Sequence, residues 1–85
     1  MKLFKFKAIW GRDNENVANW IRVNDAIHAH MPPVIRARWM KDGYEGLADS
    51  ALGYFGINNI YRDEDEAVTF EFTEAQWTWF QLKWL

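Results

Sequence analysis

Residues 67–85 read AVTFEFTEAQWTWFQLKWL, and the structure that this segment adopts decides the architecture of the chain. Alternate residues from Val68 to Phe72 are apolar, a period of two that predicts a strand with one buried face. The last ten residues, 76–85, contain three of the six tryptophans. So many large rings in a short segment indicate either a part of the hydrophobic core or a binding surface.

A helix is one interpretation of this aromatic segment. Thr73 and Gln76 have the spacing of a capping box, in which each side chain bonds the backbone N–H of the other residue at the start of a helix. Trp77, Phe80 and Trp84 would then share one helical face.

A strand is the other interpretation and the preferred one, because Trp, Phe and Thr all favour strands. The residues TEAQ before it would then form a hairpin loop. The side chains directed to the core would be Phe80, Leu82 and Trp84. Those directed outward would be Trp77, Trp79, Gln81 and Lys83.

The first part of the chain predicts a strand followed by a helix. KLFKFKAIW at residues 2–10 alternates between two faces, which is typical of a strand. Apolar residues recur at helical spacing over residues 17–31, with Asp13 or Asn14 as the capping residue. Two consecutive prolines then end the helix, because a residue that precedes proline is excluded from the α region.

The middle of the chain predicts a second strand and a second helix. VIRARWM at residues 34–40 alternates and is bounded by PP and KDG, although a helix beginning at Pro33 is an alternative. YEGLADSALGYF at residues 44–55 has an apolar stripe of helical spacing, and Gly56 follows where a glycine closes a helix. Residues 57–62 are a short strand or a loop.

The predicted order of elements is therefore β-α-β-α-β-β. This order is typical of an α+β domain built as a two-layer sandwich, with a sheet of about four strands and two helices on one face. We expect residues 1–85 to form a single domain whose other sheet face is open to solvent.

Charge is unevenly distributed along the chain. Residues 1–41 carry eight Lys and Arg against three Asp and Glu, whereas residues 42–85 carry two against nine. Such asymmetry favours attraction between the two halves, in one fold or in a homodimer, or a charged partner. The chain has no cysteine and no apolar run of about 18–20 residues. We therefore expect no disulfide, no signal peptide, no membrane contact and a cytoplasmic location.

The sequence predicts no catalytic residue, no metal site and no cofactor. His28 and His30 are two positions apart on a helix and do not face each other, so they do not form a ligand pair. No phosphate-binding glycine loop is present, and the protein is not expected to be an enzyme. Four consecutive acidic residues predict a solvated turn or a docking patch for a basic partner, and these are Asp63, Glu64, Asp65 and Glu66.

The open sheet face is the candidate binding site. Its expected basic and aromatic residues are Lys5, Lys7, Arg36, Arg38, Trp77, Trp79 and Lys83. Exposed Trp and Tyr with Arg nearby are typical of the hot spots of protein interfaces, and a protein partner is the preferred hypothesis. The alternative is single-stranded nucleic acid, whose bases stack on aromatic rings while cations contact the phosphates. The acidic second half of the chain argues against nucleic acid.

The tail RDEDEAVTFEFTEAQWTWFQLKWL, residues 62–85, resembles the C-terminal hairpin of many small uncharacterised tailed-phage proteins. Those proteins often end on an acidic turn, an aromatic strand and an F-x-L-x-W pattern, here Phe80, Leu82 and Trp84. The resemblance implies a phage-encoded accessory protein that acts inside a bacterial cell by binding and inhibiting a host protein, for example a nucleic-acid-binding or defence protein. It also favours the strand interpretation of the aromatic segment.

Overall fold

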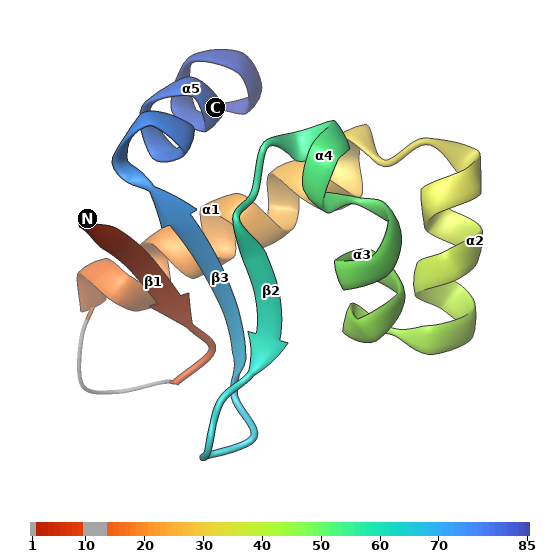
Figure 1. The fold of residues 1–85 in the computed structure, drawn as a ribbon, viewed down its shortest axis with the longest axis horizontal. Coiled ribbons are helices and arrows are strands. Elements are labelled where there is room, and N and C mark those ends of the chain that lie inside the picture. Colours follow the sequence, from red (N-terminus) through yellow and green to blue (C-terminus); the bar gives the residue numbers. More distant parts are fainter. Residues whose placement is uncertain (1, 10–13) are drawn as a thin grey trace.

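The structure, a computed structural model, describes residues 2–9 and 14–85 and shows an α+β fold (Figure 1). The strands form a three-stranded antiparallel sheet in the order β1-β3-β2, and they are β1 (Leu3–Lys7), β2 (Asn59–Arg62) and β3 (Val68–Thr73). The helices are α1 (Asn14–His30), α2 (Pro33–Asp42), α3 (Tyr44–Ser50), α4 (Leu52–Phe55) and α5 (Glu74–Trp84). The α+β class is confirmed, but the described residues form three strands and five helices rather than about four and two.

One face of the sheet is aromatic, as the alternation predicts. Across the β1–β3 ladder, Phe4 lies opposite Phe72 and Phe6 lies opposite Phe70. Ile60 of β2 lies on the other side of Phe70. All of these except the half-buried Phe4 are fully or nearly fully buried, so this face is the floor of the core.

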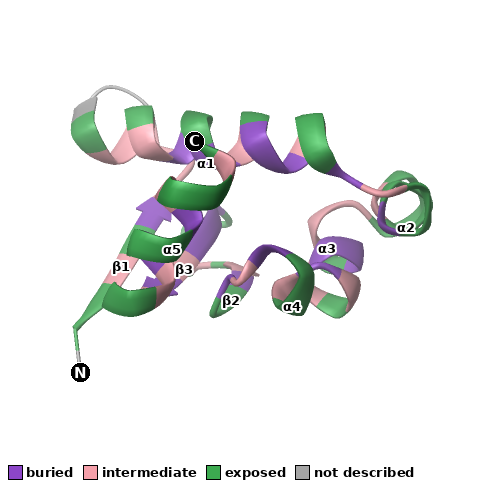
Figure 2. Ribbon diagram, turned by 90° about the horizontal axis from the view of Figure 1, so that it is seen from above, coloured by how far each residue is buried: buried purple, intermediate pink, exposed green. Residues whose placement is uncertain are grey.

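Helix α1 covers the aromatic face and forms a layer separate from the sheet (Figure 2). The indole Nε1 of Trp20 donates a hydrogen bond of 3.1 Å to the carbonyl oxygen of Val68, which ties α1 to the central strand. The Trp20 ring also stacks on Phe70, with the two centroids 5.6 Å apart.

The predictions of the sequence for the start and the end of helix α1 can be compared with the structure. The helix ends at His30, and Pro32 follows as the N-cap of α2, so the predicted proline stop is confirmed. Asn14 is the first residue of the helix. The other predicted capping residue, Asp13, lies outside the described residues.

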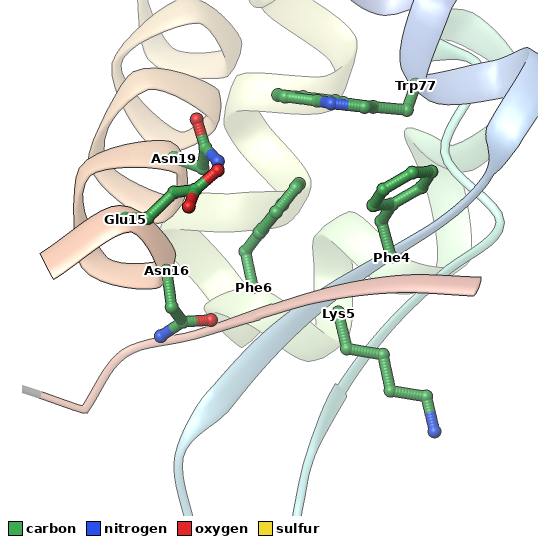
Figure 3. Close-up of a pocket in the computed structure, with 7 residues that line it drawn as sticks. All are labelled: Phe4, Lys5, Phe6, Glu15, Asn16, Asn19 and Trp77. Atoms are coloured by element: carbon green, nitrogen blue, oxygen red, sulfur yellow. The ribbon is translucent and has the colours of Figure 1, made fainter. Parts of the chain in front are cut away.

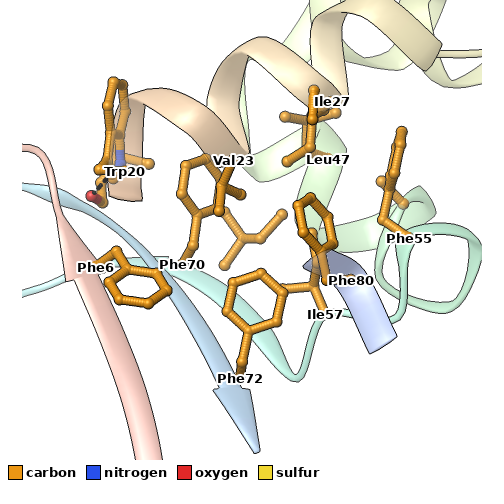
Figure 4. Close-up of a cluster of buried hydrophobic side chains, with 14 of the residues drawn as sticks. Phe6, Trp20, Val23, Ile27, Leu47, Phe55, Ile57, Phe70, Phe72 and Phe80 are labelled. Carbon is orange, nitrogen blue, oxygen red and sulfur yellow. Dashed lines mark hydrogen bonds between the residues drawn. The ribbon is translucent and has the colours of Figure 1, made fainter. Parts of the chain in front are cut away.

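The core lies between α1, the aromatic sheet face and the first two turns of α5 (Figure 4). Its fully buried large side chains come from every layer of the fold, and they include Val23, Ile27, Leu47, Phe55, Phe70, Phe72 and Phe80.

The strand predicted over residues 34–40 is wrong, since this segment is helix α2. Pro33 occupies the first turn, where its fixed φ suits a helix and its missing N–H has no cost. Ile35 and Trp39 alternate in sequence but are also four residues apart, so a helix places both on one face. The alternative helix beginning at Pro33 is therefore the correct interpretation.

The second predicted helix forms but is divided. Its backbone breaks at Ala51 (φ −108°, ψ −13°), which separates α3 from α4. Gly56 closes α4 in the left-handed conformation (φ 71°), and its N–H donates to the carbonyl oxygen of Leu52. The predicted closing glycine is thus confirmed, and residues 59–62 are a strand rather than a loop.

The strand predicted over residues 77–84 is also wrong, because these residues belong to α5. The capping box is complete: Gln76 N–H donates to Thr73 Oγ1 at 3.2 Å, and Thr73 N–H donates to Gln76 Oε1 at 2.9 Å. The sheet supplies a second reason, since β3 already has β1 on one side and β2 on the other. No edge of β3 is left for a hairpin partner.

Candidate protein-binding surface

The outer face of α5 carries large apolar side chains that the core does not use. Leu82 is 84% exposed and Trp79 is 44% exposed. Tyr54 on α4 and Leu85 after α5 add further exposed apolar area. We call these residues together with Lys83 the α5 surface: Tyr54, Trp79, Leu82, Lys83 and Leu85. Trp79 and Leu82 line the same hollow, and neighbouring exposed apolar side chains are typical of interaction sites.

The Trp79 ring is held in place by the end of α4. A Cβ atom at Gly56 would lie only 2.9 Å from Cζ3 of Trp79, so the ring lies directly on the glycine backbone. A shallow hollow lies on each side of the ring. One is lined by Gly53, Gly56, Ala75, Gln76 and Trp79, and the other by Glu74, Ala75, Thr78, Trp79 and Leu82. Trp79 is therefore a ridge between two depressions.

Lys83 places a positive charge over this aromatic surface. Its Nζ lies 4.7 Å from the centroid of the Trp79 ring and 5.0 Å from that of Trp84. The Trp84 ring packs in turn against Phe55 of the core, with the centroids 5.1 Å apart. A cation over an aromatic ring is attracted by the negative face of the ring, and this attraction holds Lys83 near Trp79.

The structure corrects the predicted faces of the aromatic segment. Trp77 was expected to point outward, but it is only 9% exposed and packs on Phe6. Leu82 was expected in the core and is almost fully exposed. Phe80 is buried, as predicted, and Trp79 and Lys83 lie on the surface, as predicted. The helical period explains all of these positions.

Lys5 and Lys7 do lie on the sheet face away from the helices, but both take part in ion pairs. Lys7 Nζ is 2.9 Å from Oδ2 of Asp63, and Lys5 Nζ is 4.0 Å from Oε1 of Glu71. Thr69, which lies opposite Lys7 in the β1–β3 ladder, is fully buried. The open face is therefore a paired polar layer, and the two lysines are not unpaired phosphate ligands.

Arg36 and Arg38 do not share that face, because residues 34–40 are helical. Arg38 pairs with Asp49 at 2.8 Å and lies 3.8 Å from Asp42. Arg36 donates a hydrogen bond of 3.0 Å to the carbonyl oxygen of His28. The predicted basic and aromatic sheet face does not exist as one surface.

The acidic turn divides into a structural residue and three exposed ones. Oδ1 of Asp63 accepts hydrogen bonds from the N–H groups of Asp65 (2.9 Å) and Ala67 (3.0 Å), which shapes the β2–β3 turn. Glu66 adopts a positive φ of 62°, and its carbonyl oxygen accepts from Arg62. The side chains left on the surface are those of Glu64, Asp65 and Glu66.

The Lys7–Asp63 pair gives a pH-dependent contribution to stability. The hydrogen bond from Lys7 holds the pKa of Asp63 below its ordinary value of 3.8, with help from the two backbone N–H groups. Because the pKa is lower in the folded state, the stabilisation is complete above about 3.8 and is lost as the pH falls through the lower folded value. Asp63→Asn is expected to reduce the loss of unfolding free energy at acidic pH. Urea titrations made at several pH values measure this loss. Substitution of the exposed Asp65 with Asn is the control and should leave this loss of unfolding free energy unchanged.

Leu82, Tyr54 and Leu85 are the surface residues that the sequence interpretation missed. The signal was present, because Trp79 and Leu82 are three residues apart and a helix places them together on one face. The strand interpretation of residues 77–84 places Leu82 on the opposite face from Trp79. Among residues 2–9 and 14–85, no group of three or more His, Asp or Glu side chains is placed to hold a metal ion.

Comparison with models of known protein families, with curated protein sequences and with solved structures gave no significant match. Within the part of the chain that the structure describes, no helix has the length and apolarity required to cross a bilayer.

Proposed function

We propose that this protein works by binding another protein through the α5 surface. The observation that carries the proposal is the exposure of Trp79 and Leu82 side by side, with Lys83 over the Trp79 ring. Trp and Tyr are among the residue types that dominate the binding energy of protein interfaces. The two hollows beside Trp79 offer depressions in which side chains of a partner would fit.

We further propose that the partner is a host protein in the cytoplasm of a bacterial cell, and that the chain is a phage-type accessory protein that inhibits or modulates it. The support is the resemblance of residues 62–85 to tailed-phage proteins. Only the F-x-L-x-W part of this pattern lies on a helix, α5, whereas the acidic turn and the aromatic strand belong to the β2–β3 hairpin.

A protein partner suits the charges better than nucleic acid does. The α5 surface has a single cation, Lys83, and the acidic Glu74 borders one of its hollows. Lys5, Lys7 and Arg38, which were expected to contact phosphates, are each paired with a carboxylate. Binding of nucleic acid depends on unpaired cations that displace counterions from the phosphates.

Substituting Trp79 and Leu82 together with Ala is expected to remove partner binding while the fold persists. Loss of a hot-spot pair weakens binding by on the order of 2 kcal/mol or more, about thirtyfold in Kd. The assay is affinity capture from a bacterial lysate read by mass spectrometry, followed by titration of the captured protein. The thermal unfolding midpoint of each variant shows whether the fold persists.

The matched control is Val34→Ala with Met40→Ala on α2, where the side chains are 75% and 73% exposed. This pair removes comparable exposed apolar area from a different face and is expected to leave capture unchanged. Capture that survives the Trp79 and Leu82 double substitution contradicts the proposal. A salt-sensitive anisotropy change with single-stranded oligonucleotides, lost on neutralisation of Lys5 and Lys7, would support nucleic acid instead.

A further inference from the structure

Strand β1 is at the edge of the sheet, and the structure shows which of its residues direct their backbone N–H and C=O groups toward β3. Ala8 N–H donates to the carbonyl oxygen of Val68 at 3.0 Å, in line with the β1–β3 register. In an antiparallel ladder, consecutive residues direct their backbone groups alternately toward and away from the neighbouring strand. The N–H and C=O groups of Phe4 and Phe6 therefore face β3, whereas those of Lys5 and Lys7 face the open edge.

The fold closes parts of its sheet edges with asparagine side chains. The Asn16 amide accepts from Lys7 N–H at 2.9 Å and donates to the Lys7 carbonyl oxygen at 2.8 Å, as a neighbouring strand would. On the opposite edge, Ile60 N–H donates to Oδ1 of Asn59 at 2.9 Å. Among the described residues, no corresponding group covers the outward N–H and C=O of Lys5. The edge is thus protected at Lys7 and open at Lys5.

A pocket lies beside this open position, between β1, α1 and the start of α5 (Figure 3). It has a volume of about 210 Å³, close to the size of one large side chain. Figure 3 shows Phe4 and Phe6 pointing into it, Trp77 above them, and Glu15 and Asn19 on the α1 side, while the Lys5 side chain points away. The pocket therefore combines apolar rings with an acidic rim.

We propose that the β1 edge and this pocket bind an extended peptide segment of a partner protein by strand addition, with an Arg or Lys side chain in the pocket. The backbone of the added strand would pair with the N–H and C=O of Lys5. In such binding, backbone hydrogen bonds give affinity and a pocket for alternate side chains gives specificity. The site differs from the α5 surface in both position and chemistry.

The acidic rim of the pocket favours a basic side chain at the peptide position that points into it. Glu15 is exposed and forms no ion pair among the described residues, so its carboxylate is available to a cation. An Arg side chain would pack its methylene groups on Phe4 and Phe6 and reach the Glu15 carboxylate with its guanidinium. The neighbouring residues of the peptide would point to the other face, where a carboxylate would reach the half-exposed ammonium of Lys5, which is held only by a 4.0 Å ion pair with Glu71. The expected motif is therefore acidic–basic–acidic in extended conformation.

Hydrogen exchange of the free protein, followed by NMR, tests the edge itself. The amides of Phe4 and Phe6 are expected to be protected by β3, and that of Lys7 by Asn16. The Lys5 amide is expected to exchange rapidly. A protected Lys5 amide in the free, monomeric protein would mean that the edge is already closed, and the proposal would be wrong.

Binding is tested with the peptide acetyl-Thr-Ile-Glu-Arg-Glu-Ile-Thr-amide, in which Arg and the two Ile share one face. Its addition is expected to shift the Lys5 amide signal and slow its exchange, with little change in exchange at Lys7. A peptide with Glu in place of Arg is expected to bind on the order of tenfold more weakly. Unchanged Lys5 signals at the highest soluble peptide concentration would overturn the proposal.

Reversing the charge of Glu15 tests whether the peptide is recognised by the pocket or attracted by the overall charge of the protein. Glu15→Arg is expected to weaken binding of the Arg peptide on the order of tenfold and to favour the Glu peptide. Glu45→Arg on α3 makes the same change of charge away from the pocket and is expected to keep the preference for Arg. Equal effects of the two variants would contradict a role for the pocket.

Discussion

Trp77→Ala is expected to lower the free energy of unfolding by about 3–5 kcal/mol, the range found when a buried Trp or Phe is truncated. The Trp77 ring is 9% exposed, and its centroid lies 4.7 Å from that of Phe6 and 5.2 Å from that of Phe72. Its removal would leave a cavity at the junction of β1, β3 and α5. Urea unfolding followed by circular dichroism measures the change directly.

Trp79→Ala provides the matched comparison, since it removes the same side chain two residues further along α5. Trp79 is 44% exposed and rests on Gly56, so its loss is expected to cost about 1 kcal/mol or less. Equal destabilisation by the two substitutions would contradict the helical arrangement of residues 77–84. A stable Trp77→Ala variant would instead support the outward orientation that the strand interpretation predicts.

Gly46→Ala is expected to destabilise the protein by about 1–3 kcal/mol, although Ala is the better helix former by about 1 kcal/mol. Gly46 of α3 lies against the backbone of Arg38 in α2. A Cβ atom there would overlap the carbonyl oxygen of Arg38 and lie 2.8 Å from its carbonyl carbon. Because these are backbone atoms, the two helices would have to move apart. Thermal and urea unfolding of the variant measure the cost.

Gly53→Ala is the control, because it measures the gain from replacing Gly with Ala in a helix without a steric clash. A Cβ atom at Gly53 would meet no heavy atom within 4 Å, and the residue is exposed. This substitution is expected to stabilise the protein by about 0.5–1 kcal/mol, because it reduces the freedom of the unfolded chain. If Gly46→Ala is stabilising to the same degree, then α2 and α3 are not in the close contact described above.

The parts of the fold that sequence predicts well are those fixed by a single local pattern. The alternation around Phe6 and Phe70 has no helical counterpart, and both strands form where they are expected. Residues 34–40 and 77–84 satisfy the strand and the helix periods at once. Their structure depends on neighbours, since β3 has no unpaired edge and α2 packs against α3. A sequence pattern does not contain that information.

The candidate site was predictable only in part for the same reason. Trp79 and Lys83 lie on the surface in either structure of the segment, whereas Trp77 and Leu82 exchange places between strand and helix. The pairing of charges is also hidden in the sequence. Lys7 meets Asp63 across more than fifty residues of chain, and such partners are identified only by the fold.

The position of β3 in the sheet has a consequence for how the chain reaches its native state. The central strand is the latest of the three in sequence, and β1 pairs with it across separations of 62 residues (Lys7 with Thr69) to 70 residues (Leu3 with Thr73). Such long-range contacts require closure of a large loop before they contribute any stability. During synthesis, β1 therefore stays without its strand partner until residues 68–73 leave the ribosome, and the β1–β3 half of the sheet assembles late.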